Sequence, residues 1–173
     1  METLTTARLT LEPLVVAHAT AMFDVLQDPS IFAFTDGAPP ESIDALATRY
    51  ARLETRRSPD GKQRWLNWIV VDEGGAPCGY VQATVQADGR AWVAYVIASG
   101  RRGRGYATEA MRAMLAQLAL DTTLERFMAT VEADNVASIR LLERLDFRAP
   151  RGGEGAGIAL APTELLFVKT VPR

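Results

Sequence analysis

Six short segments of the chain carry apolar residues that alternate with polar ones or form brief unbroken runs, and both patterns predict β-strands. The predicted strands cover residues 7–13, 64–73, 78–86, 91–98, 126–133 and 163–171. An Asp88-Gly89 pair, which is typical of a tight hairpin turn, separates two of them. The middle of the chain is therefore predicted to form an antiparallel meander.

In four longer segments the apolar residues recur at intervals of three and four, which is the spacing of one face of an α-helix. These predicted helices cover about 15–27, 41–57, 110–118 and 135–145, and residues 30–40 are predicted to form a loop. Toward the C-terminus the order becomes strand, helix, strand, helix. The pattern predicts an α+β (mixed α/β) fold, and 173 residues suit a single domain, 1–173.

Composition narrows the choice of partners. Nineteen Lys and Arg against twenty-one Asp and Glu leave a net charge of −2, which draws the whole molecule neither to nucleic acid nor to an anionic membrane. Cys78 and His18 are the single residues of their kinds, so neither a disulfide nor a metal site is expected. We predict a core thiol and a surface or hydrogen-bonded histidine. No secretory signal or long apolar run is evident, so a cytoplasmic protein is expected.

The segment Arg101–Ala110, RRGRGYATEA, concentrates three arginines and two glycines where a predicted strand passes into a predicted helix. Two functions suit such a segment: a flexible basic tag for RNA, or a rigid cradle for a phosphorylated ligand. The lack of low-complexity sequence around it favours the cradle. Gly103 and Gly105 allow a ligand to approach main-chain N–H groups closely, and the helix dipole favours an anion there.

The same segment resembles the acetyl-CoA signature of the GNAT superfamily of N-acetyltransferases, Gln/Arg-x-x-Gly-x-Gly/Ala, which is met by Arg102, Gly105 and Ala107. About thirty residues later, DNVASIRLLERLDF resembles the family's Asn-x-x-Ser helix, with Asn135 and Ser138 in register. With TARLTLEPL near the start, the likeness covers roughly residues 5 to 150. It is greatest to the ribosomal-protein N-terminal acetyltransferase (RimJ/RimL-like) branch.

This resemblance implies a GNAT-type central sheet, mostly antiparallel, of six to seven strands with a V-shaped splay, flanked by about four helices. It implies transfer of an acetyl group from acetyl-CoA, the cosubstrate, to a primary amine by direct attack in a ternary complex. The amine would be a protein N-terminal α-amine or that of a small molecule. The cofactor-binding residues that it implies are Val96, Ile97, Ala98, Arg102, Gly103, Arg104, Gly105, Tyr106, Ala107, Thr108, Asn135 and Ser138.

The chain departs from the family pattern at two points of its last predicted helix. Asp146 replaces the family's glycine before Phe147; since Asp tolerates left-handed turns, the helix end should be preserved. Leu142 stands where many relatives carry a tyrosine as general acid. Ser138 is therefore the catalytic candidate that would hydrogen-bond the departing sulfur, with a solvated helix residue as the alternative.

A general base is harder to find in the sequence. The strand that ends near Tyr95 lacks the carboxylate of many relatives, which leaves Glu132 as the candidate, or else as a solvated strand end. An α-amine with a pKa of about 7.7–8.0 is roughly one-tenth neutral at pH 7, whereas a lysine near 10.4 is neutral in about one molecule per few thousand. The missing base therefore favours an α-amine or another weakly basic acceptor.

Two other functions remain open at this point. One is a non-catalytic acyl-CoA-binding module, which the missing tyrosine and carboxylate suggest; the other is RNA binding through the arginines of residues 101–104. The sequence identifies neither the acceptor nor the choice between monomer and homodimer. The aromatic residues that either line an acceptor pocket or belong to the core are Phe32, Phe34, Trp65 and Trp68.

Overall fold

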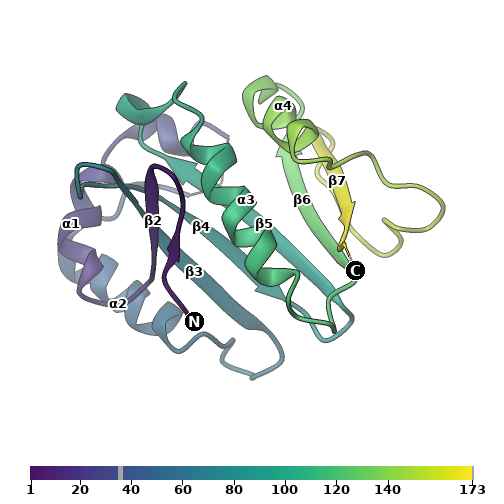
Figure 1. Ribbon diagram of the computed structural model, residues 1–173, viewed down its shortest axis with the longest axis horizontal. Coiled ribbons are helices and arrows are strands. Elements are labelled where there is room, and N and C mark those ends of the chain that lie inside the picture. The colour runs from purple at the N-terminus through teal and green to yellow at the C-terminus, as the bar shows by residue number, and fades with distance from the viewer. Residues whose placement is uncertain (35–36, 173) are drawn as a thin grey trace.

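The computed structural model describes residues 1–34 and 37–172, so the predicted loop at 30–40 includes two positions, 35 and 36, that lie outside the described residues. Seven strands form one sheet, and their order in the sheet follows their order in the chain (Figure 1). They are β1 (Leu4–Thr5), β2 (Leu9–Pro13), β3 (Arg64–Asp72), β4 (Pro77–Val85), β5 (Arg90–Ile97), β6 (Arg126–Glu132) and β7 (Glu164–Thr170). The six predicted strands are confirmed.

The opening in the sheet lies between β5 and β6, the one parallel pair among antiparallel neighbours. These two strands pair over three positions, Arg90–Trp92 with Arg126–Met128, and then diverge. The predicted V-shaped splay is thus confirmed (Figure 1). Past the divergence, main-chain polar groups on the inner edges of both strands have no ladder partner, and they need another one.

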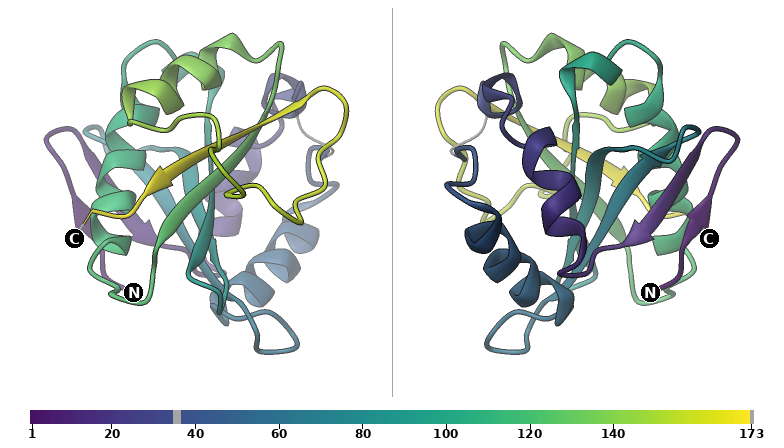
Figure 2. Two further views of the ribbon diagram at one scale, coloured as in Figure 1. Left: turned by 90° about the vertical axis from the view of Figure 1, so that its right-hand side faces the viewer. Right: turned by 90° about the vertical axis from the view of Figure 1, so that its left-hand side faces the viewer.

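Helices cover both faces of the sheet. Figure 2 shows α1 (His18–Val25) and α2 (Ile43–Glu54) on one face, and α3 (Tyr106–Leu118) and α4 (Val136–Arg144) on the other. Each pair of helices has its own apolar core against the strands. The predicted stripe of α3 is confirmed as its buried face, consisting of Ala110, Met111, Met114, Leu115 and Leu118.

Short 3₁₀ turns complete the two loops above the opening. Pro29–Phe32 forms η1, which follows α1 inside the segment predicted as a plain loop, and Ser99–Arg101 forms η2 between β5 and α3. The Asp28 carboxylate begins η1 by accepting a hydrogen bond from the Ser30 amide at 2.9 Å. Hydrogen bonds from Ser99 and Ser30 lower the pKa of Asp28 to about 2.

The end of α4 shows how the chain accommodates Asp146. This residue has φ 63°, in the left-handed region, so it takes the place that glycine usually fills after a helix. Its amide donates to the Glu143 carbonyl, and the Phe147 amide donates to the Leu142 carbonyl, both at 3.0 Å. This is a Schellman motif, and Phe147 is buried beneath it. The predicted helix end is confirmed.

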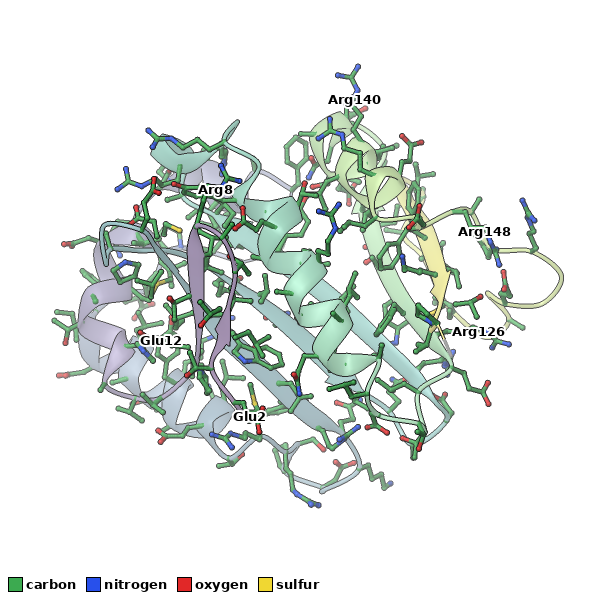
Figure 3. All side chains as sticks on the ribbon, in the orientation of Figure 1. Glu2, Arg8, Glu12, Arg126, Arg140 and Arg148 are labelled. Carbon is green, nitrogen blue, oxygen red and sulfur yellow. The ribbon has the colours of Figure 1, made fainter. Side chains whose placement is uncertain are left out.

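Helix boundaries and the first strand differ from the sequence prediction. α1 begins at His18 rather than near residue 15, and α2 is shorter than predicted at both ends. Its start is set by Ser42, which caps the first turn by accepting a hydrogen bond from the Ala45 amide. β1 has only two residues, too few for a readable alternation. The Trp68 indole donates a hydrogen bond of 3.0 Å to the carbonyl of Glu2 and so anchors this end of the chain; Figure 3 shows the position of Glu2.

None of the described helices has the length and apolar character needed to cross a membrane.

Candidate functional site

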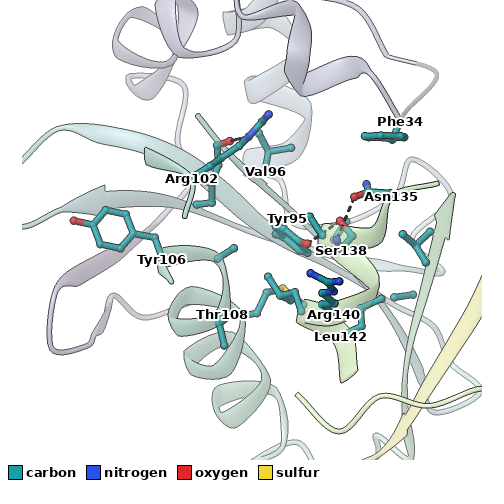
Figure 4. Close-up of a pocket in the computed structure, with 18 of the residues that line it drawn as sticks. Phe34, Tyr95, Val96, Arg102, Tyr106, Thr108, Asn135, Ser138, Arg140 and Leu142 are labelled. Carbon is teal, nitrogen blue, oxygen red and sulfur yellow. Dashed lines mark hydrogen bonds between the residues drawn. The ribbon is translucent and has the colours of Figure 1, made fainter. Parts of the chain in front are cut away.

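A cavity of about 560 Å³ occupies the opening between β5 and β6 (Figure 4). Its walls are the end of β5, the start of α3, the end of β6, one side of α4, and η1. It gathers most of the residues that the sequence singled out. Those that line it are Val96, Ile97, Arg102, Gly103, Gly105, Tyr106, Ala107, Thr108, Glu132, Asn135 and Ser138. Ala98 and Arg104, which were also predicted to bind the cofactor, are not among its lining residues.

The first turn of α3 offers main-chain donors to the cavity. None of the amides from Gly103 to Thr108 donates a hydrogen bond to any acceptor within residues 1–34 and 37–172. Gly103 and Gly105 adopt φ of 76° and 80°, in the left-handed region that residues with a Cβ atom rarely adopt. The turn therefore presents a run of free N–H groups at a helix N-terminus, where the helix dipole adds positive potential. Such a site favours an anion.

Arg8 holds this turn from the N-terminal hairpin. Its Nε and Nη2 donate to the Glu109 carboxylate at 2.9 and 2.6 Å, and its Nη1 donates to the Arg104 carbonyl at 2.8 Å. Its guanidinium also lies over the Tyr106 ring, 5.0 Å from the centroid. Burial raises the pKa of Glu109, but hydrogen bonds from Thr6 and Arg8 outweigh it, so the pKa is below its usual value. The charged pair fixes the turn in place, and Figure 3 labels Arg8 at the N-terminal hairpin.

Arg102 spans the mouth of the cavity in this structure. Its Nε donates to the Ile97 carbonyl at 3.1 Å, and its Nη2 donates to the Ser30 carbonyl at 3.3 Å. Figure 4 shows its side chain beside Val96 at the edge of β5. Arg102 thus supplies the unpaired end of β5 with a hydrogen-bond partner and ties it to η1.

The N–H and C=O groups at the end of β5 point alternately toward β4 and toward the opening. The Ala98 amide donates to the Cys78 carbonyl at 2.8 Å, and the Ala98 carbonyl accepts from the Arg101 amide at 2.9 Å. Both backbone groups of Ala98 are therefore already bonded. Because the direction of main-chain groups alternates along a strand, Val96 also turns its N–H and C=O toward β4. Tyr95 and Ile97 turn theirs toward the opening.

Ser138 lies one turn into α4, and its surroundings are more polar than the sequence suggested. Its amide donates to Asn135 Oδ1 at 3.1 Å, so Asn135 caps the helix as predicted. Its Oγ accepts a hydrogen bond of 2.8 Å from the Tyr95 hydroxyl (Figure 4). Tyr95 also lines the cavity, and it was not predicted as a site residue. Burial raises the pKa of Tyr95, although its hydrogen bond to Ser138 lowers it in part.

The remaining candidate residues either line the cavity or belong to the core. Glu132 lines the cavity at the end of β6, and Leu142, in the position of the family's tyrosine, is buried at its wall. Of the four aromatic residues considered for an acceptor pocket, Phe34 lines the cavity and is 46% exposed. Trp68 belongs to the core, and Phe32 packs against the core beneath α1 and α2.

Two residues predicted to have structural roles do have them. Cys78 is a buried free thiol, and burial raises its pKa to about 11. His18 is hydrogen-bonded on both ring nitrogens, to the Val15 amide at 3.1 Å and to the Glu12 carboxylate at 3.0 Å. Over the part of the chain that the structure describes, His, Cys, Asp and Glu residues form no group of three suited to a metal ion.

The fold and this site define an acetyltransferase of the GNAT type. A family model for the acetyltransferase (GNAT) domain matches residues 8–148, and the chain therefore belongs to this family of enzymes. Among curated proteins, it is similar to the uncharacterized N-acetyltransferase p20 of Bacillus licheniformis, with 29% identity over 150 residues, covering 86% of this chain and 83% of p20.

Two solved structures illustrate the similarity of the fold. The RimJ protein of Mycobacterium smegmatis, in complex with a CoA disulfide, superposes with a TM-score of 0.78 at 22% identity, over 98% of this chain and 87% of its own. A Salmonella typhimurium acetyltransferase that modifies the N-terminal serine of ribosomal protein L7/L12 has a TM-score of 0.80 at 13% identity, over 99% and 100%. The GNAT fold predicted from the two motifs is confirmed, and its structural neighbours include RimJ and RimL proteins.

Proposed function

We propose that this acetyltransferase moves an acetyl group from acetyl-CoA to a primary amine, by direct attack of the amine while both substrates are bound. The observation that carries the proposal is the row of unpartnered amides from Gly103 to Thr108 at the N-terminus of α3. These amides border a cavity between two diverging strands. A diphosphate is an anion with several acceptor oxygens, and this row matches it. The CoA complex of the RimJ neighbour supports the choice of ligand.

The residues present fit such a donor from its diphosphate to its thioester. The amides at 103–108 and the arginines beside them would hold the diphosphate. The pantetheine arm would lie along the inner edge of β5, where Tyr95 and Ile97 direct their main-chain groups into the opening. If the arm bonds to the Ile97 carbonyl in place of the Arg102 guanidinium, the guanidinium would be free to turn toward the phosphates. The thioester would reach the Tyr95–Ser138 pair at the inner end of the cavity.

The contribution of the protein to the reaction would be mainly to position the amine and the thioester. Holding the amine and the thioester together accounts for much of the acceleration in such a reaction. Ser138 would hydrogen-bond the sulfur as it leaves, and because a thiol has a pKa near 8.5 a weak donor is enough. Glu132 is the candidate to receive the proton of the amine, directly or through water.

For the acceptor we propose an α-amine or another weakly basic amine. The described cavity lining contains one carboxylate, Glu132, at the end of a strand rather than enclosed among apolar groups. A site of this kind suits an amine that is already partly neutral at pH 7. The L7/L12-modifying neighbour acts on a protein N-terminus, which makes peptides with a free N-terminus the first acceptors to test.

The test is a release assay for free CoA with acetyl-CoA and a panel of acceptors: N-terminally free peptides, the same peptides with blocked N-termini and a free lysine, and small amines. We expect turnover with the free α-amines and little with lysine alone. The pH–rate profile should follow the pKa of the acceptor amine. Turnover limited to lysine side chains would contradict the proposed acceptor, and calorimetric evidence of no CoA binding would contradict the proposed donor site.

A further inference from the structure

The Tyr95 hydroxyl meets Ser138 Oγ across the opening of the sheet. The two residues are 43 positions apart in the sequence, one on β5 and one on α4, and their oxygens are 2.8 Å apart. Figure 4 shows the Tyr95 ring lying beside the first turns of α4, with its hydroxyl directed at Ser138. Neither hydroxyl has a second hydrogen-bond partner within the described residues. The pair therefore bridges the two walls of the cavity.

We propose that Tyr95 is a positioning residue for the transfer reaction: its hydroxyl occupies one acceptor site of Ser138 and leaves the Ser138 proton directed into the cavity. This inference rests on the proposed function, in which the departing sulfur lies at that end of the cavity. It extends the function by assigning a role to a tyrosine on the opposite wall from the helix that carries the family's usual acid.

The hydrogen-bonding capacity of a serine hydroxyl supports this role. The hydroxyl has one proton to donate and two lone pairs with which to accept. Serines in helices often donate to the carbonyl four residues earlier, which here is that of Asp134. No such bond is present in the described part of the chain. With the Tyr95 proton on one lone pair, the Ser138 proton is left without an acceptor and is available to a ligand. A hydroxyl that accepts a hydrogen bond is also a stronger donor.

The surroundings of Tyr95 keep it in the donating form. Burial raises the pKa of its hydroxyl above the usual value of 10.0, so the group carries its proton throughout the neutral range. Its ring packs against the main core, which also fixes the direction of the hydroxyl. Tyr95 does not act as a base under these conditions. Its contribution is the orientation of Ser138.

The test compares Tyr95→Phe with Tyr80→Phe. Tyr80 is on the neighbouring strand β4, is half-buried with a pKa that burial also raises, packs beneath α1 and α2, and lies outside the cavity. Both changes remove one hydroxyl and keep the ring. We expect Tyr95→Phe to lower kcat about tenfold, which corresponds to one lost hydrogen bond, with the KM for acetyl-CoA changed less than about twofold. Tyr80→Phe should leave both constants unchanged.

A double-mutant cycle distinguishes a role of Tyr95 in positioning Ser138 from a role that is independent of Ser138. If Tyr95 acts through Ser138, Tyr95→Phe should cause no further loss of kcat in a Ser138→Ala background. Equal losses in both backgrounds would overturn the proposal, and so would a Tyr95→Phe enzyme as active as Tyr80→Phe. Equal melting temperatures of the two tyrosine variants exclude a difference in folding. If the wild-type protein releases no CoA with any amine, the proposed function itself fails. If the wild-type protein releases CoA and Tyr95→Phe is equally active, only the positioning role fails.

Discussion

The cofactor cradle can be tested by adding one methyl group at Gly103. This residue has φ 76°, and a Cβ built on it would meet no atom within 4 Å, so Gly103→Ala introduces backbone strain but no clash. Gly75, in the turn between β3 and β4, has the same φ of 76° and the same open surroundings, but it lies outside the cavity. Gly75→Ala is therefore a matched control for the strain alone.

The expected magnitudes follow from the two conformations. A left-handed alanine costs about 1–2 kcal/mol, and the stiffer unfolded chain returns about 0.4–1 kcal/mol, so each variant should lose roughly 1 kcal/mol of folding free energy. For a chain of this length the melting temperature should fall by about 2–4 °C in both. In Gly103→Ala, relaxation of the strained turn should also remove at least one charge-assisted hydrogen bond to the diphosphate. Such a bond contributes about 1.5–3 kcal/mol, or roughly 10- to 150-fold in Kd.

Isothermal titration with CoA measures the second effect, and a thermal melt measures the first. If the amides at 103–108 hold the diphosphate, the two variants should have equal melting temperatures and differ in Kd by at least about tenfold. If Gly103→Ala binds CoA as tightly as Gly75→Ala does, the amides at 103–108 do not hold the diphosphate. If both variants lose affinity together, the loss reflects stability and not the cradle.

Three further changes probe the surroundings of the cavity. Glu109→Gln weakens the hold of Arg8 on the cradle and should raise the Kd for CoA about threefold to tenfold by titration, while Asp121→Asn, which breaks a surface pair elsewhere, should not. Hydrogen bonds from the Ala76 amide and Arg101 hold the pKa of Asp72 below 3.8, so its stabilisation is complete above that pH and is lost as the pH falls through the lower folded value. Melts carried from neutral pH to below 3.8 should show the onset of this loss in the wild type and a flatter curve in Asp72→Asn. Phe34→Ala should raise the KM of the acceptor several-fold with an unchanged Kd for CoA, and an unchanged acceptor KM would remove Phe34 from the acceptor site.

The parts of the site that the sequence predicted are those built from neighbouring residues. The cradle needs only a strand, two glycines and the start of a helix within ten positions, and this order is visible in RRGRGYATEA. The cap of α4 by Asn135 and the left-handed Asp146 at its other end are equally local. Each depends on the conformation of one or two residues, so the residue type alone indicates it.

The parts that the sequence did not predict join distant segments. Arg8 and Glu109 are 101 positions apart, and their contact depends on how the N-terminal hairpin lies against α3. Tyr95 and Ser138 meet only because β5 and β6 diverge after three paired positions and allow α4 to approach β5. No single-sequence pattern encodes that angle. A tyrosine at the end of a strand reads as an ordinary half-buried residue until the opposite wall is known.

The splay between β5 and β6 also accounts for the contacts that Arg102 makes. Separating two strands leaves main-chain groups without partners, and buried groups of this kind must be satisfied. In this structure Arg102 satisfies the Ile97 carbonyl and at the same time holds Ser30 of η1. A ligand that took over the Ile97 carbonyl would remove the first of these contacts, and Arg102 would then be the link between the donor site and η1. Since Phe34 follows η1 and lines the same cavity, the proposed function predicts that donor binding also affects the acceptor side of the cavity.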